Sequence, residues 1–290
     1  MAGPLPFLRL LRAGTLFSPA ADVVAGLCIA GAATGNAVWS VDAVRAVLAS
    51  ALLYGGGMVC NDVADRREDA VQRPERPLPR GDVALPAAVA LGAALLLGGV
   101  CLSPYRSYHG AIVVLVLAYD FACKRRPLPG VLAMGTLRAL NLAVASAPLY
   151  PSLPVPLLAA AVCYGGYVAA ITLLGIQEDL PAPRARTVVA ARSAPPLLAL
   201  LGLVAVQGAP WPAPLLALPP VLWFLWQGRA TTVWDRPAIR RSMTHLLLGT
   251  MLYTALLCVA VARPVEAIAI ALCIPLARAV TRRLQFRTMS

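Results

Sequence analysis

Long apolar runs, separated by short polar gaps, follow one another along this 290-residue chain. Ten runs occur, at residues 15–38, 43–60, 84–103, 109–122, 130–149, 155–176, 193–208, 212–227, 243–262 and 265–280. About 20 helical residues are needed to span the hydrocarbon core of a bilayer. The pattern predicts an all-α, polytopic bundle of nine to ten transmembrane helices. The count is nine if two short runs form one broken helix. We expect residues 1–290 to form a single transmembrane domain, because no soluble segment interrupts the pattern.

The composition agrees with a membrane protein. Hydrophobic residues make up 59% of the chain and charged residues 13%, with a mean hydropathy of +0.74. Soluble domains contain about 25% charged residues, and disordered chains combine low hydrophobicity with high charge. Both classes are therefore excluded. Four tryptophans near predicted helix ends are typical of an interfacial belt: Trp211, Trp223, Trp226 and Trp234.

The charged residues predict the topology. The formal net charge is +12. If the N-terminus is cytoplasmic and successive segments cross the membrane in opposite directions, 21 basic residues lie on the cytoplasmic side and three on the outer side. This asymmetry is what the positive-inside rule expects. It predicts a multi-pass protein of the cell (inner) membrane, with the N-terminus and the acidic loops in the cytoplasm. Nucleic acid is not an expected partner, because the arginines lie in short gaps between apolar runs.

Three carboxylates at the end of the second run are the strongest chemical signal. Asp62, Asp65 and Asp69 are spaced i, i+3 and i+7, so a helix places them on one face. A shared divalent cation would relieve their repulsion, and Mg²⁺ prefers oxygen ligands. The alternative is a solvated helix end in which these acids pair with Arg66 and Arg67.

Other polar residues stand out against apolar surroundings. Arg138 lies inside a predicted span, where a charge is costly, so a function or a partner is expected, and Asn141 follows one turn later. We expect Asp22, in the first predicted span, to lie either near a pocket or beside a basic partner. Lys124, the only lysine, is either a cytoplasmic anchor or a ligand-binding residue. Residues 55–57, three glycines, predict close helix packing rather than a phosphate loop.

The acidic segment resembles a known signature. Residues 61–69 match the N-D-x-x-D-x-x-x-D motif of the UbiA family of intramembrane prenyltransferases at all four positions. Residues 76–81, 119–125 and 135–141 resemble further segments of that family in the same order. The pattern is most similar to UbiA-like proteins of bacterial Ebo-type gene clusters.

This resemblance implies a UbiA-like fold and a reaction. The reaction is Mg²⁺-dependent transfer of an isoprenyl group, within the membrane, from an isoprenoid diphosphate to a small acceptor such as an aromatic compound. It implies metal binding by Asp62, Asp65, Asp69, Glu178 and Asp179. It also implies substrate binding by Asn61, Arg76, Tyr119, Arg138 and Asn141, and catalytic roles for Asp62, Asp65 and Lys124.

The resemblance to the UbiA family also implies a second acidic motif after the sixth helix, typically D-x-x-D or D-x-x-x-D, and this sequence departs from it. In residues 175–184 only Glu178 and Asp179 are acidic, and adjacent residues point about 100° apart on a helix. Pro181 and Pro183 are expected to end the helix at once. A second metal site here is therefore expected to be weak or differently built.

Two other functions stay open. A membrane terpene cyclase would ionise the same diphosphate without an acceptor. A transporter or lipid-binding protein without catalysis is the alternative from another class. Consumption of an isoprenoid diphosphate, and the nature of its product, would distinguish the three.

Overall fold

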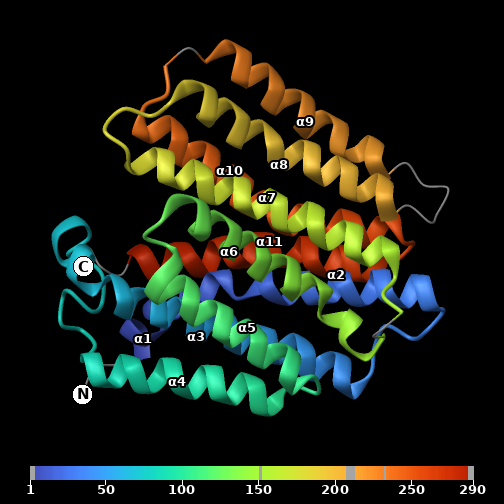
Figure 1. Ribbon diagram of the computed structural model, residues 1–290, viewed down its shortest axis with the longest axis horizontal. Coiled ribbons are helices and arrows are strands. Elements are labelled where there is room, and N and C mark those ends of the chain that lie inside the picture. Colours follow the sequence, from blue (N-terminus) through green and yellow to red (C-terminus); the bar gives the residue numbers. More distant parts are fainter. Residues whose placement is uncertain (1–3, 150–151, 207–212, 232, 287–290) are drawn as a thin grey trace. The chain divides into compact units, whose positions relative to one another are not determined.

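The chain is all-helical where its structure is described. The computed structural model describes residues 4–149, 152–206, 213–231 and 233–286 (Figure 1). These residues form eleven α-helices and no β-strand, which confirms the predicted fold class. The α-helices are α1 (Pro4–Leu10), α2 (Phe17–Thr34), α3 (Val41–Gln72), α4 (Leu85–Leu102), α5 (Arg106–Ala118), α6 (Pro127–Leu142), α7 (Val155–Asp179), α8 (Ala185–Val206), α9 (Ala213–Ala230), α10 (Arg236–Ala260) and α11 (Pro264–Phe286). Three short helices complete the set: η1 (Ala13–Thr15), η2 (Tyr119–Cys123) and η3 (Ala143–Leu149).

The long helices coincide with the predicted runs. Helices α2 to α11 correspond in order to the ten apolar runs. Eight segments in the described residues are long and apolar enough to cross a membrane; α5, with 13 residues, and α9 are not among them. The chain is thus an integral, multi-pass membrane protein. The number of crossings and the side on which each loop lies stay predictions.

Several helices extend beyond the predicted runs. Helix α3 ends at Gln72 instead of residue 60, α8 begins at Ala185 instead of 193, and α10 begins at Arg236 instead of 243. The 32 residues of α3 measure about 48 Å, more than the hydrocarbon thickness of about 30 Å. The apolar runs therefore marked the part of each helix suited to hydrocarbon, whereas the helices continue into polar sequence. For α3 this continuation carries the acidic motif.

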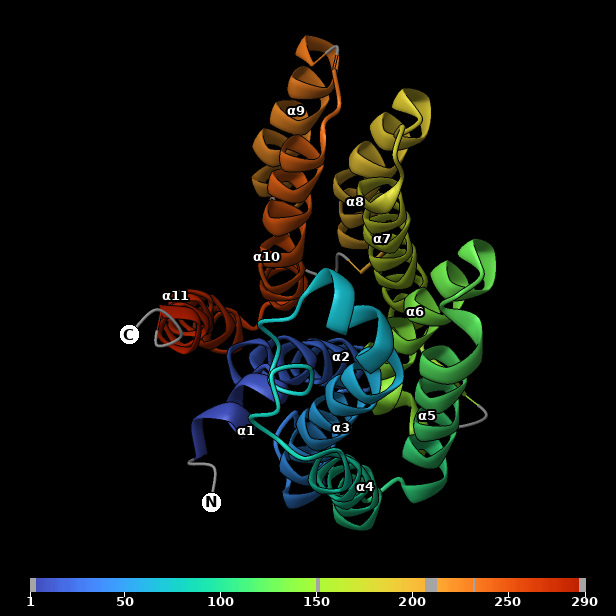
Figure 2. The same cartoon turned by 90° about the vertical axis from the view of Figure 1, so that its left-hand side faces the viewer.

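The described chain divides into two compact units. Unit 1 comprises Met1–Ala20, Trp39–Ala122 and Leu272–Ser290, and unit 2 comprises Ala21–Val38 and Cys123–Ala271. In unit 1, α3 packs against α4 and α5 (Figure 2). A Cβ atom at Gly56 would lie 2.9 Å from the Leu96 side chain, and one at Gly57 would lie 3.2 Å from Val116. This confirms the close packing predicted for the glycine run. The single-domain assignment stays a prediction.

Unit 2 is built around α7. Helix α7 packs against α6 and α8, α9 packs against α8, and α10 contacts both α7 and α8 (Figure 1). The backbones of α6 and α7 approach each other at two glycines. A Cβ atom at Gly135 would lie 2.7 Å from the carbonyl oxygen of Gly165, and one at Gly165 would lie 2.8 Å from that of Gly135. Small residues at such a crossing let membrane helices pack closely.

Candidate functional site

Two buried carboxylates lie on one face at the end of α3. Asp62 and Asp69 are 4% and 3% exposed, whereas Asp65 is half-buried. The side chain of Arg76 joins the two buried acids. Its Nη1 lies 3.3 Å from Oδ1 of Asp62 and 2.6 Å from Oδ2 of Asp69. The acids therefore share a face, as their spacing predicts.

A second arginine reaches this face from the N-terminal segment. Nη2 of Arg12 donates to Oδ1 of Asp62 at 3.0 Å. We call Asp62, Asp69, Arg12 and Arg76 the α3 cluster. Arg73 is more distant, with Nη1 3.9 Å from Asp69. The alternative partners considered from sequence, Arg66 and Arg67, form none of these ion pairs.

Local sequence explains how Arg76 is positioned. After α3, Pro77 and Pro79 prevent another helix from forming, and Gly81 adopts a positive φ of 79° that favours glycine. Leu78 and Val83 pack into an apolar core with Leu10, Val59 and Ala88. This packing anchors the loop on both sides of the turn, so that Arg76 points back to α3. Because Leu10 belongs to the same core, the segment that carries Arg12 is anchored there too.

Tyr119 and Asp120 also belong to the surroundings of the α3 acids. The charges of Asp120, Asp65 and Arg12 all act on the phenol of Tyr119. Asp120 is 2% exposed and lies in η2, a π-helix, a type that is often found at functional sites. Neither Arg12 nor Asp120 was predicted from the sequence to be a site residue. Asp120 could have been found, since it is a charge inside the predicted run 109–122, and a charge inside a predicted span is the criterion that selected Arg138.

Asn61 and Lys124 complete the residues predicted near the first motif. Asn61 is half-buried on α3 in unit 1. Lys124 is half-buried, follows η2 directly and belongs to unit 2. The roles predicted for these two side chains in binding the diphosphate stay predictions.

Arg138 and Asn141 lie in a separate buried network in unit 2. Nη2 of Arg138 lies 3.1 Å from Oδ1 and 3.0 Å from Oδ2 of Asp22. Asn141 donates to Oδ2 of Asp22 at 2.9 Å, and the Tyr164 hydroxyl donates to Oδ1 at 2.5 Å. We call these four residues the α6 cluster. Asp22 thus has the basic partner that was one of its two expected placements. The substrate-binding roles of Arg138 and Asn141 stay predictions.

The second acidic pair lies at the end of α7. The helix ends at Asp179, immediately before Pro181 and Pro183, as predicted. Oε1 of Glu178 lies 2.8 Å from Arg240, and Oδ1 of Asp179 lies 3.5 Å from Arg236. The side chain of Glu178 is 13% exposed and that of Asp179 is 61% exposed, so the two point in different directions. Their predicted metal binding stays a prediction.

The side chains that could bind a metal ion determine which kind of metal site this region can form. Among the residues described, no group of three or more histidine, cysteine or acidic side chains is placed to hold a metal ion. The described part of the chain therefore offers no complete set of protein ligands for a metal ion. Mg²⁺ usually binds through one or two carboxylates, with water and substrate phosphates filling the other positions. Asp62 and Asp69, buried and close to cationic donors, fit that second arrangement.

Solved structures share the fold. A UbiA homologue from Archaeoglobus fulgidus, bound to DMAPP and Mg²⁺, has a TM-score of 0.64 at 16% identity and covers 91% of this chain and 98% of its own. An apo UbiA homologue from Aeropyrum pernix K1 has a TM-score of 0.61 at 21% identity and covers 89% and 96%.

Sequence relatives match a part of the chain. A digeranylgeranylglyceryl phosphate synthase of Metallosphaera sedula is 35% identical over 148 residues, which is 47% of this chain and 49% of the relative. That of Methanoculleus marisnigri is 33% identical over 137 residues, which is 45% and 47%. The chain thus spans about half the length of these relatives. The profile described as the UbiA prenyltransferase family matches residues 23–248, and the chain belongs to that family.

Proposed function

We propose that this protein transfers an isoprenyl group from an isoprenoid diphosphate to a small acceptor within the membrane, with Mg²⁺ at the α3 cluster. The observation that carries the proposal is the pair of buried carboxylates, Asp62 and Asp69, bridged by Arg76 in a chain of the UbiA family. Two structures of the Archaeoglobus fulgidus homologue contain Mg²⁺ with DMAPP or with GPP, which supports the donor class and the metal.

The charges of the α3 cluster suit a diphosphate. The side chains of Arg12 and Arg76 are 36% and 20% exposed, so an incoming anion can reach them. Guanidinium groups form strong, often bidentate hydrogen bonds with phosphate oxygens. Asp62 and Asp69 supply carboxylate oxygens for the cation. When bound, Mg²⁺ stabilises the negative charge that develops on the leaving diphosphate.

The reaction breaks the bond between C1 of the isoprenoid and the diphosphate oxygen, and the electron pair leaves with the diphosphate. C1 then bonds to the acceptor nucleophile, and the acceptor loses a proton. Arg12 and Arg76 donate hydrogen bonds to the diphosphate as its charge increases. Asn61 and Asp65 assist in binding it, and the ring of Tyr119 faces the developing cation.

The names of the sequence relatives bear on the class of acceptor. The relatives are digeranylgeranylglyceryl phosphate synthases, and this name favours a glyceryl phosphate acceptor over an aromatic one. The arginine distribution favours an active site that opens to the cytoplasm. The relation to Ebo-type proteins suggested by the sequence stays a prediction.

The test is product analysis with purified protein. Geranylgeranyl diphosphate and Mg²⁺ are supplied with a prenylated glyceryl phosphate, with an aromatic acceptor or with no acceptor, and products are identified by mass spectrometry. We expect a prenylated acceptor from the wild type and its loss in Asp62→Asn. Glu68→Gln is the matched control, because this exposed acid lies on the same helix and hydrogen-bonds Gln72.

Each other outcome contradicts the proposal. A hydrocarbon product formed without an acceptor would identify a terpene cyclase. No consumption of the diphosphate, under conditions where the protein stays folded, would favour a transporter or lipid-binding protein.

A further inference from the structure

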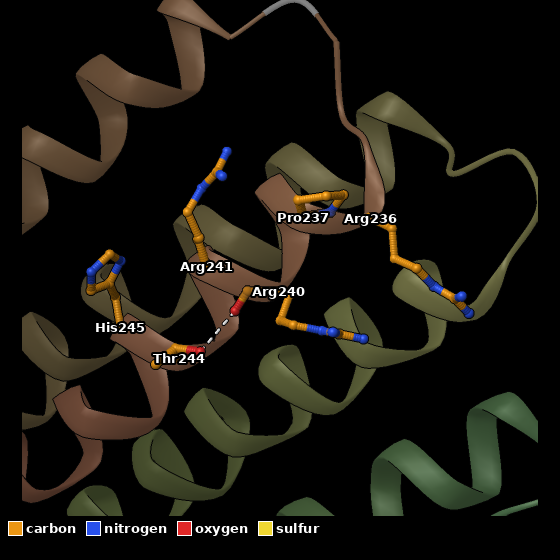
Figure 3. A pocket seen from close by; sticks show the side chains of 6 residues that line it. All are labelled: Arg236, Pro237, Arg240, Arg241, Thr244 and His245. Carbon is orange, nitrogen blue, oxygen red and sulfur yellow. Dashed lines mark hydrogen bonds between the residues drawn. The ribbon is translucent and has the colours of Figure 1, made fainter. Parts of the chain in front are cut away.

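The first turns of α10 carry a basic pocket that the proposed prenyl transfer does not use. The pocket has a volume of about 490 Å³, and its exposed lining residues are Arg236, Pro237, Arg240, Arg241, Thr244 and His245. Figure 3 shows Arg236 and Arg240 extending from one side of α10, whereas Arg241 and His245 extend from another. Members of each pair are four residues apart, so they are neighbours on the helix surface.

The acidic residues nearby leave this region positively charged. Glu178 and Asp179 form ion pairs with Arg240 and Arg236. Arg241 forms no ion pair with any residue in the described ranges. Residues 178–245 contain seven arginines and three acidic residues. Such an excess of arginine attracts anions.

A buried arginine lies in the same three-helix region. Arg192 of α8 is 2% exposed and donates from Nη2 to Oε1 of Gln227 at 3.0 Å. Its Nε and Nη1 are buried and have no hydrogen-bond partner among the described residues. The guanidinium lies 5.4 Å from the ring of Phe224 and 5.0 Å from that of Trp234. Trp234, which the sequence placed in the interfacial belt, is 8% exposed and covers this cation. A buried cation with unused donors is suited to binding an anion.

Aromatic contacts connect the buried arginine with the pocket. The ring of Phe224 lies 4.8 Å from that of Trp223, and Trp223 lies 5.9 Å from His245, which lines the pocket. Arg192, the aromatic residues of α9 and the first turns of α10 therefore form one continuous cluster within unit 2.

The surrounding surface carries exposed residues of the types found at membrane interfaces. Trp223 and Trp226 on α9 are 40% and 65% exposed. Further along α10, Leu247 and Leu252 are 53% and 42% exposed. Tryptophans occupy the headgroup level of a bilayer, and exposed leucines suit its acyl chains. A soluble anion needs no apolar surface beside its binding site, whereas the acyl chains of a lipid do.

We propose that this end of α8, α9 and α10 binds the phosphate headgroup of an anionic membrane lipid. Arg241 contacts the phosphate, and Arg192 supplies the donors buried behind the aromatic residues. Basic pockets beside transmembrane helices are suited to such headgroups, because a guanidinium matches phosphate in charge and geometry. This inference goes beyond the proposed prenyl transfer and requires no part of the α3 cluster.

The test measures lipid retention. The purified full chain is reconstituted in phosphatidylcholine vesicles with or without phosphatidylglycerol and extracted gently, and bound lipid is counted by native mass spectrometry. We expect retained phosphatidylglycerol, and at least a fivefold loss in Arg241→Gln and in Arg192→Gln. Arg278→Gln, an exposed arginine on α11, is the matched control and retains the lipid.

Two results would overturn the proposal. One is equal retention by Arg241→Gln and the wild type, which does not depend on the folding of the Arg192 variant. The other is full displacement of the lipid by millimolar inorganic phosphate, which would indicate a site for soluble anions. The measurement is made without isoprenoid diphosphate, so its failure is distinct from failure of the proposed prenyl transfer.

Discussion

Two buried aspartates in this protein each pair with arginine, but the arginines differ in exposure. In the α6 cluster, the side chain of Asp22 is 1% exposed and that of Arg138 is 11% exposed. In the α3 cluster, the side chain of Asp62 is 5% exposed, whereas those of Arg12 and Arg76 are 36% and 20% exposed. The aspartates are alike, and what differs is the access of solvent or ligand to the cation.

The difference separates a fixed ion pair from one that can exchange partners. Both oxygens of Asp22 accept hydrogen bonds from enclosed donors on α6 and α7, so the pair fastens α2 to those helices. Breaking such a pair leaves a buried charge without compensation. Arg12 and Arg76 can turn to a ligand or to water at much smaller cost. We therefore expect mutations in the α6 cluster to affect stability, and those in the α3 cluster to affect reactivity.

The largest effect on stability is expected for Asp22→Asn. The variant leaves Arg138 buried without its counter-charge and should lower the free energy of unfolding by about 3–5 kcal/mol. Thermal unfolding of the purified protein measures the change. The control is Asp42→Asn, because Asp42 is 56% exposed and pairs with the exposed Arg45. That change should cost less than about 1 kcal/mol. Equal unfolding temperatures for the two variants would remove the distinction between the clusters.

Arg76→Gln tests the other side of the comparison. Loss of a donor to the leaving diphosphate should lower the rate of prenyl transfer by about 100-fold, while the unfolding temperature stays close to that of the wild type. Arg80→Gln serves as the control, because Arg80 lies in the same loop and is 48% exposed beside Asp82. A variant that unfolds early and keeps its rate would show that Arg76 is structural.

Gly165→Ala examines the packing that holds the α6 cluster. The added methyl group meets the backbone of Gly135, so α6 and α7 must separate, at a cost of about 1–3 kcal/mol. Gly98→Ala on α4 is a suitable control, since a Cβ atom there has nothing within 4 Å. Thermal unfolding measures the stability of both variants. If the two variants have the same stability, the close crossing of α6 and α7 does not contribute as described.

Tyr164→Phe should have the smallest effect. Removal of the hydroxyl deletes the hydrogen bond that it accepts from Arg138 and the one that it donates to Asp22, at a combined cost of about 1–2 kcal/mol. Combined with Asp22→Asn, it should add less than its separate cost, because the two residues share that hydrogen bond. Fully additive costs in the double variant would show that they act independently.

Much of the fold was predictable, because apolar runs of helical length identify membrane helices regardless of tertiary contacts. Helix ends such as Gln72 of α3 were not predictable from hydropathy, since the helix continues through charged residues that hydropathy assigns to loops. Local spacing is sufficient to predict the shared face of Asp62 and Asp69, because that face follows from helix geometry alone.

Partners distant in the sequence were harder to predict. Asp22 meets Arg138 across 116 residues, and Arg12 meets Asp62 across 50. Each pairing depends on which helices pack together, and a single sequence carries no direct signal of this. The cost of burying a charge showed that Arg138 needs a function or a partner, but it did not identify Asp22 as that partner.

The most direct test of the α3 cluster is metal binding without turnover. Mn²⁺ replaces Mg²⁺ and is followed by electron paramagnetic resonance, with inorganic diphosphate present or absent, in the wild type, Asp62→Asn and Glu68→Gln. We predict that wild type and Glu68→Gln bind Mn²⁺ much more tightly when diphosphate is present, and that Asp62→Asn loses this enhancement. An unchanged diphosphate-dependent signal in Asp62→Asn would contradict the assignment of the α3 cluster as the metal and diphosphate site.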